Sequence, residues 1–167
     1  MTTESAEPAR QAHTGGRLVI VCGLPASGKT TLARTLATER RGLRLAPDEW
    51  LNALGTNLWD AAMRERVEAL QWSLAQELLR IRTTVIIEWG TWARSERDAL
   101  RSQASALGAT TELIYLDVDD EELWRRIQQR AMEVPPIQRT DLREWRGLFE
   151  APDDAELARY DTWSAPT

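Results

Sequence analysis

The eight residues GLPASGKT at positions 23–30 match the pattern G-x-x-x-x-G-K-[ST] at every fixed position, and this pattern is typical of loops that bind phosphate groups. Lys29 within this stretch is the only lysine of the chain, and all the other permanently charged basic residues are arginine. A compact ammonium suits a phosphate-binding loop better than the planar fork of arginine. The stretch therefore indicates a nucleotide-binding site.

The residues on either side of this stretch favour the same interpretation. Residues 17–22, RLVIVC, form a short apolar run rich in β-branched side chains, and residues 31–37, TLARTLA, have helical spacing, so the loop joins a buried strand to a helix. Loop amides and the helix N-terminus would bind the phosphates, with Lys29 at the β- and γ-phosphates and Thr30 on Mg²⁺. The residues expected at the nucleotide are Gly23, Ala26, Ser27, Gly28, Lys29, Thr30 and Thr31. The alternative is a tight strand-to-helix turn without a ligand.

Composition limits the classes of protein to consider. The chain has 167 residues, a length that suits one domain. Its net charge of −5 disfavours a general attraction to nucleic acid or anionic membrane. No apolar run has the length of a membrane span or of a signal peptide, so we expect a cytoplasmic protein. The single cysteine, Cys22, lies on the first strand and is expected to be a buried thiol.

Strands and helices alternate along the rest of the chain. We expect residues 1–16 to be a disordered leader and residues 17–167 to be a single domain that carries the P-loop. Further strands are predicted at 42–48, 83–88 and 113–117, with helices around 67–81 and 93–107. The core face of the first of these two helices is expected to carry Val67, Leu70, Leu74, Leu78 and Ile81. This alternation predicts an α/β fold, a three-layer P-loop NTPase with a parallel sheet and helices on both faces.

Three acidic residues lie at the C-terminal ends of predicted strands, at the rim of the sheet where ligands bind in such folds. Asp48 suits a base that accepts a proton from an attacking hydroxyl, although it could instead cap the next helix. Glu88 suits a ligand of Mg²⁺, directly or through water, or a contact to the acceptor. Asp117 begins an acidic run that introduces a helix, and the helix dipole explains such acids adequately.

Arginines follow this acidic run. Arg126 and Arg130 are four residues apart and share one face of a predicted helix, and Pro135-Pro136 then forces an extended segment before Arg139. We expect this segment to close over bound nucleotide as a lid, in which Arg126, Arg130 and Arg139 neutralise the charge of phosphoryl transfer. The alternative is a solvated basic face.

These residues resemble the P-loop predicted-kinase family related to chloramphenicol phosphotransferase, the zeta-toxin kinases and the kinase domain of polynucleotide kinase. The resemblance rests on residues 23–30, 48–50, 88–97 and 126–130, and it spans residues 17 to about 140. It implies that Asp48 is the catalytic base, that Arg97 contacts acceptor or phosphate, and that Arg126 and Arg130 are lid arginines. Such relatives often have aspartate where this chain has Glu88.

The residues and the resemblance together predict an ATP- and Mg²⁺-dependent phosphotransferase that moves the γ-phosphoryl group to a hydroxyl of a small molecule. An antibiotic, a sugar or a nucleoside-like metabolite are candidate acceptors. Trp92, with Trp89, could form an aromatic wall of the acceptor pocket, and core packing is an equal alternative. The competing functions are a polynucleotide 5′-hydroxyl kinase, which the acidic balance disfavours, and a nucleotide-dependent switch or binding module. The sequence predicts no oligomeric state.

Overall fold

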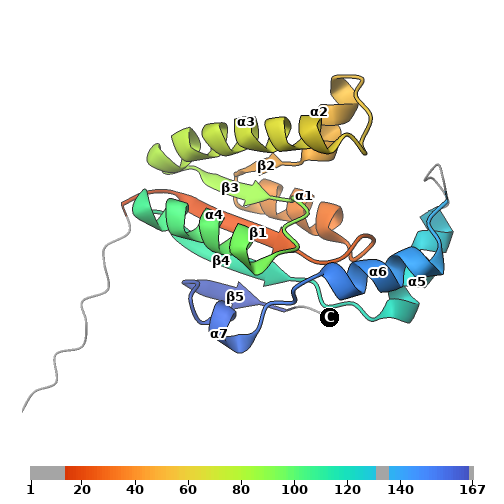
Figure 1. Cartoon of the computed structure of the whole chain (residues 1–167). Helices are drawn as coiled ribbons and strands as arrows, with labels where there is room; N and C mark the ends of the chain where they lie inside the picture. The colour runs from red at the N-terminus through yellow and green to blue at the C-terminus, as the bar shows by residue number, and fades with distance from the viewer. Residues whose placement is uncertain (1–13, 131–135, 166–167) are drawn as a thin grey trace, which may run out of the picture.

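A sheet of five parallel strands forms the centre of the computed structural model, which describes residues 14–130 and 136–165 (Figure 1). The strand order is β2-β3-β1-β4-β5. The strands are β1 (Arg17–Cys22), β2 (Leu43–Leu45), β3 (Thr84–Ile87), β4 (Thr110–Tyr115) and β5 (Thr162–Ser164). Because β1 pairs with both β3 and β4, the loop that follows β1 leaves the sheet near its middle.

Helices cover both faces of this sheet. They are α1 (Lys29–Glu39), α2 (Pro47–Ala53), α3 (Ala61–Arg80), α4 (Arg94–Ala106), α5 (Asp120–Arg130), α6 (Arg139–Leu148) and α7 (Asp154–Leu157). Side chains of α3 and α4 pack in one buried cluster, and side chains of α1 pack in another. Figure 1 shows α3 and α4 on one side of the sheet and α1 on the other. The predicted three-layer P-loop fold is confirmed.

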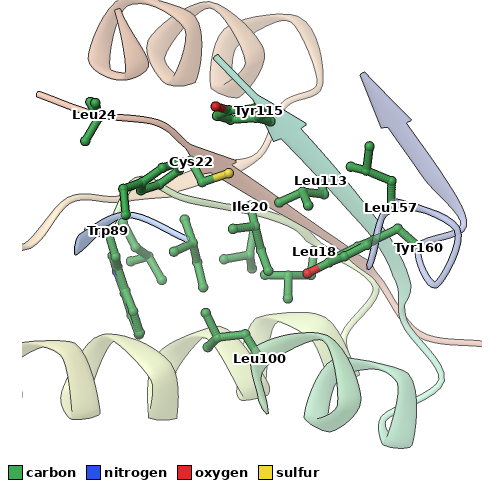
Figure 2. Close-up of a cluster of buried hydrophobic side chains, with 14 of the residues drawn as sticks. Leu18, Ile20, Cys22, Leu24, Trp89, Leu100, Leu113, Tyr115, Leu157 and Tyr160 are labelled. Atoms are coloured by element: carbon green, nitrogen blue, oxygen red, sulfur yellow. The ribbon is translucent and has the colours of Figure 1, made fainter. Parts of the chain in front are cut away.

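The central strand β1 is apolar on both sides because both of its faces are covered. Side chains alternate along a strand, so Leu18 and Ile20 join the larger cluster while Val19 and Val21 join the cluster beneath α1. Cys22 is buried in the larger cluster, as expected from the sequence (Figure 2). Burial raises the pKa of this thiol to about 12, which makes it a poor nucleophile.

Several element boundaries differ from those predicted. The second strand ends at Leu45, and Pro47 is the first residue of α2, because the fixed φ of proline suits the first turn of a helix. The fourth strand starts at Thr110, three residues before its predicted start. The short, exposed strand β5 was not predicted at all.

The predicted core face of α3 is correct for Val67 and in part for the half-buried Leu78, and it is wrong for the other three residues. The buried positions are Val67, Gln71, Ala75 and Leu79, whereas Leu70, Leu74 and Ile81 are exposed. Both sets have helical spacing, so periodicity alone could not choose between them. The buried set contains Ala75, which lets the helix approach the sheet closely, and Gln71, which accepts a hydrogen bond from the Trp89 indole at 2.9 Å.

The predicted leader falls mostly on residues 1–13, which lie outside the described residues. The last part of this predicted segment is tied to the fold. Gly15 N donates to Gly108 O at 2.9 Å, and Gly16 N donates to Leu79 O at 2.7 Å. Among the described residues, no helix combines the length and the apolar character that a membrane crossing requires.

Candidate functional site

The loop between β1 and α1 has the geometry of a phosphate-binding loop. Gly23, Ala26 and Gly28 have positive φ angles of 151°, 66° and 101°. A Cβ atom on Gly23 would lie 2.8 Å from the Ser27 Oγ, so only glycine fits there. Gly28 is the N-cap of α1, and in the described part of the chain no side chain caps this helix. The first amides of α1 can therefore serve an anionic ligand.

Lys29 is folded into this loop. Its Nζ donates to the carbonyl oxygens of Gly23 and Leu24, both at 2.9 Å. Burial lowers the pKa of Lys29 to about 8, and this effect exceeds the opposing effect of nearby carboxylates. A nucleotide phosphate would offer the ammonium a charged partner in place of the two carbonyl groups.

Thr30, the next residue, forms a hydrogen bond with Glu88 at the tip of β3. The Thr30 hydroxyl donates to Oε1 of Glu88, and the Glu88 side chain is only 8% exposed. A hydroxyl and a carboxylate are hard oxygen ligands of the kind that Mg²⁺ prefers. The described residues contain no group of three or more acidic, histidine or cysteine side chains that could hold a metal ion. This set therefore fits Mg²⁺ that is shared with nucleotide phosphates and water, as is usual for this ion.

Asp48 is the second residue of α2 and does not cap this helix, because the N-cap position is occupied by Ala46. Its side chain is 65% exposed, and its Oδ1 accepts a hydrogen bond from Nη2 of Arg64 at 2.5 Å. Arg64 lies in the first turns of α3. Sequence reasoning missed Arg64, and its position opposite Asp48 follows only from the packing of α3 beside α2.

The structure brings Lys29, Asp48 and Glu88 within electrostatic reach of one another. The charges of Glu88 and Asp48 both raise the pKa of Lys29 against the larger effect of burial, and the charge of Arg130 lowers it. The predicted phosphate loop, base and metal ligand therefore share one rim of the sheet. Glu68, one turn beyond Arg64 on α3, adds a further carboxyl whose pKa is raised, mainly by burial.

Arg126 contacts the phosphate loop from the side of α5. Its Nη1 donates to the carbonyl oxygens of Ser27 at 3.1 Å and Ala26 at 3.4 Å, and its Nε donates to Glu122 at 2.6 Å. Arg126 also lines a cavity of about 470 Å³ together with Asp117, Val118, Asp119, Asp120, Glu122 and Arg146. The loop thus has the cavity on one flank and Asp48 on the other.

The remaining predicted lid arginines differ in position. Arg130 is the last residue of α5 and is exposed. Residues 131–135, which carry much of the predicted lid, lie outside the described residues. Arg139 forms an ion pair with Glu121 of α5 and lies over the Trp124 ring, 5.8 Å from its centroid. In this structure Arg139 therefore connects α6 to α5.

The structure corrects the expectation for Arg97. This side chain is completely buried and pairs with the buried Glu156 through bonds of 2.6 and 2.9 Å. Its other hydrogen bonds go to the backbone oxygens of Thr91, Trp92 and Glu150. Arg97 therefore connects α4 to the C-terminal segment and does not reach an acceptor. The sequence could not indicate this role, because Glu156 lies 59 residues further along the chain.

The two tryptophans after β3 have different surroundings. Trp89 is buried in the core and its indole donates a hydrogen bond to Gln71. Trp89 is therefore a core residue (Figure 2). Trp92 is half-buried, and its ring contacts Trp145 of α6 edge-on with centroids 6.4 Å apart. Part of the Trp92 side chain is therefore exposed, and Trp92 lies four residues after Glu88 in the sequence.

Comparisons with known proteins agree with this geometry. A family described as an AAA domain matches residues 18–152, whereas no curated protein matches the chain. Among solved structures, the chain is similar to a candidate kinase from Chloroflexus aurantiacus, with 24% identity, a TM-score of 0.63, and 83% of this chain and 82% of the other covered.

Two further structures are similar over most of their length. A gluconokinase from Sinorhizobium meliloti has 20% identity and a TM-score of 0.56, with 87% of this chain and 79% of the other covered. An APS kinase from Mycobacterium tuberculosis, in complex with AMPPNP and APS, has 17% identity and a TM-score of 0.64, with 91% and 89% covered. At these identities the likeness concerns the fold, and the predicted P-loop kinase-like family is confirmed at that level.

Proposed function

The chain belongs to the AAA-domain family, and we propose that it is an ATP- and Mg²⁺-dependent kinase that phosphorylates a hydroxyl of a small molecule. The observation that carries this proposal is that Lys29, Asp48 and Glu88 follow the parallel strands β1, β2 and β3 and so lie at one rim of the sheet. A loop that only binds nucleotide needs no exposed carboxylate beside its lysine. A kinase needs one, because the acceptor hydroxyl loses a proton during transfer.

The phosphate groups would bind at the loop. The amides of residues 23–31 and the N-terminus of α1 would hold the β- and γ-phosphates, and the Lys29 ammonium would turn from the loop carbonyls toward them. Thr30 and Glu88 would hold Mg²⁺, which when bound neutralises charge on the phosphate oxygens. The likeness to a kinase structure that contains AMPPNP supports a nucleotide at this position.

The acceptor would bind on the flank formed by α2 and α3. There Asp48 would take the proton of the acceptor hydroxyl while the hydroxyl oxygen attacks the γ-phosphorus. The bond from this phosphorus to the bridging oxygen of ADP would break. Arg64 fixes the Asp48 carboxylate through the bond of 2.5 Å. Trp92 would supply an apolar surface to the acceptor.

The nucleoside would lie on the other flank, toward α5. Arg126 already contacts two carbonyl groups of the loop there, and Arg130 is close enough to lower the pKa of Lys29. These two arginines would stabilise negative charge on the transferring group. Arg139 would assist only after exchanging its present ion pair with Glu121.

An acceptor panel with the variant Asp48→Asn tests the proposal. We expect the wild-type protein to release ADP in response to one class of hydroxyl compound. Asp48→Asn should lose about 10²–10⁴-fold in kcat, the usual contribution of a general base, and should keep its affinity for ATP. Asp60→Asn is a matched control, because Asp60 caps α3 through Met63 N and lies in no proposed contact.

The panel also separates the competing functions. A labelled 5′-hydroxyl oligonucleotide as the sole acceptor would indicate a polynucleotide kinase, which the carboxylates of Asp48, Glu68 and Glu88 on the acceptor flank disfavour. ADP release that responds only to a protein would indicate a nucleotide-dependent switch. Unchanged turnover of Asp48→Asn would remove Asp48 from the reaction.

A further inference from the structure

Arg44 of β2 joins two carboxylates beside the phosphate loop. Its Nη1 donates to Oε2 of Glu88 at 2.6 Å, and its Nη2 donates to Oε1 of Glu49 at 2.5 Å. Glu49 also accepts a hydrogen bond from Arg34 of α1 at 2.8 Å. Since Thr30 of α1 binds the other oxygen of Glu88, these contacts form a closed ring that begins and ends on α1.

The backbone accounts for this arrangement. Arg44 pairs in register with Ile86, whose side chain belongs to the cluster beneath α1. Residues 86 and 88 point to the same face of the sheet because side chains alternate, so Arg44 and Glu88 both face α1. Thr30 and Arg34 are four residues apart and therefore share one face of that helix.

The charges explain why an arginine is needed at position 44. The side chains of Arg44 and Glu88 are 13% and 8% exposed, and a carboxylate so far removed from water is costly unless a cation compensates it. The Thr30 hydroxyl is neutral, and the nearby Lys29 ammonium donates to loop carbonyl groups, whereas Arg44 donates directly to this carboxylate. The planar fork of arginine also reaches two carboxylates at once, which the single ammonium of lysine does less well.

We propose that Arg44 is the positioning residue of the magnesium site. It holds the Glu88 carboxylate by one oxygen, so that the other oxygen lies toward Thr30. Through Glu49 it also ties this site to α2, the helix that carries Asp48. The inference rests on the proposed function, because it takes Thr30 and Glu88 as the residues that hold Mg²⁺. It adds a residue that contacts neither phosphate nor metal and acts through Glu88.

Calorimetry of AMPPNP binding at increasing Mg²⁺ concentration tests this role without any turnover. Loss of a residue that orients a metal ligand usually costs about 10–100-fold in metal affinity. We therefore expect Arg44→Gln to raise the Mg²⁺ concentration at half-maximal effect by about tenfold or more. Its affinity for AMPPNP without Mg²⁺ should equal that of the wild type. Arg44→Lys, which keeps the charge and is the milder change, should recover part of the loss.

Arg40→Gln is the matched control. Arg40 follows the last turn of α1 and donates to the buried carboxylate of Glu112 on β4 at 2.5 and 3.0 Å. Its loss removes a comparable ion pair from another part of the same helix, so we expect a lower melting temperature and an unchanged Mg²⁺ midpoint. A double variant of Glu88→Gln and Arg44→Gln should have the midpoint of Glu88→Gln alone, because Arg44 acts through Glu88.

The outcomes distinguish the two proposals. If AMPPNP binding by the wild type does not depend on Mg²⁺, the proposed magnesium-dependent function fails. If the wild type depends on Mg²⁺ and both Arg44 variants keep its midpoint, the positioning role is overturned while the function stands. Equal shifts in Arg44→Gln and Arg40→Gln would also overturn it, because they would indicate only a general loss of stability.

Discussion

Replacing Arg97 with methionine should lower the stability of the protein and leave its affinity for the acceptor unchanged. Methionine has a similar length and keeps much of the apolar contact made by the arginine stem. The change removes the partner of Glu156, which is 1% exposed, and leaves a buried carboxylate without a counter-charge. It also removes the donor that serves the carbonyl groups of Thr91, Trp92 and Glu150.

The size of the effect follows from these contacts. Breaking a buried ion pair by removing one partner costs about 3–5 kcal/mol, and the three carbonyl groups left without their donor place Arg97→Met toward the upper end. For a protein of this size each 1 kcal/mol lowers the melting temperature by about 2–4 °C, so we expect a fall of about 6–20 °C. Glu156→Gln keeps an oxygen acceptor for Arg97 and should lie toward the lower end.

Thermal and urea unfolding followed by circular dichroism measure this loss. Arg94→Met is the matched control, because Arg94 lies on the same helix and pairs with the exposed Asp153 at 3.0 Å. An exposed pair of this kind contributes about 0–1 kcal/mol, so the control should unfold close to the wild type. At temperatures where Arg97→Met is folded, its KM for the acceptor should match that of the wild type.

The opposite pattern would refute the reasoning. A variant Arg97→Met that melts with the wild type but has a greatly raised KM for the acceptor would place Arg97 in the acceptor site. The buried pair with Glu156 would then not describe the protein in solution.

Two other predictions concern the rim of the sheet. The pKa of Lys29 is about 8, so its ammonium is charged below this pH. The affinity for AMPPNP, measured by calorimetry, should therefore be constant below pH 8 and fall by up to about tenfold per pH unit above it. Lys29→Met should remove this pH dependence, and a wild-type affinity that does not change with pH would contradict the prediction. Arg64→Gln should misplace Asp48 and so lower kcat by roughly tenfold to a hundredfold, with unchanged affinity for AMPPNP. Substitution of the exposed neighbour, Arg66→Gln, should have no effect. A change in KM alone for Arg64→Gln would count against this role of Arg64.

The sequence predicted the parts of the fold that depend on local patterns. The GLPASGKT stretch and the apolar runs before and after it indicate the strand, loop and helix directly, because each is encoded by neighbouring residues. The rim position of Asp48 and Glu88 follows from the rule that parallel strands end at the same edge of a sheet. These inferences needed no knowledge of distant contacts.

The features that the sequence did not predict depend on such contacts. Apolar residues lie on two sides of α3, and only its packing against Trp89 and the sheet shows that Gln71 faces inward. The roles of Arg44, Arg64 and Arg97 depend on carboxylates that other elements bring to them. An arginine looks the same in a sequence whether it binds substrate or a buried glutamate.

The pairing of Arg97 with Glu156 also bears on where this domain ends. The family match stops at residue 152, four positions before the glutamate that neutralises a guanidinium in the core. A fragment cut at the limit of recognisable similarity would keep the buried cation and discard its counter-ion. The buried core therefore extends beyond the range that sequence comparison matches, because Glu156 and Leu157 of α7 are both part of it.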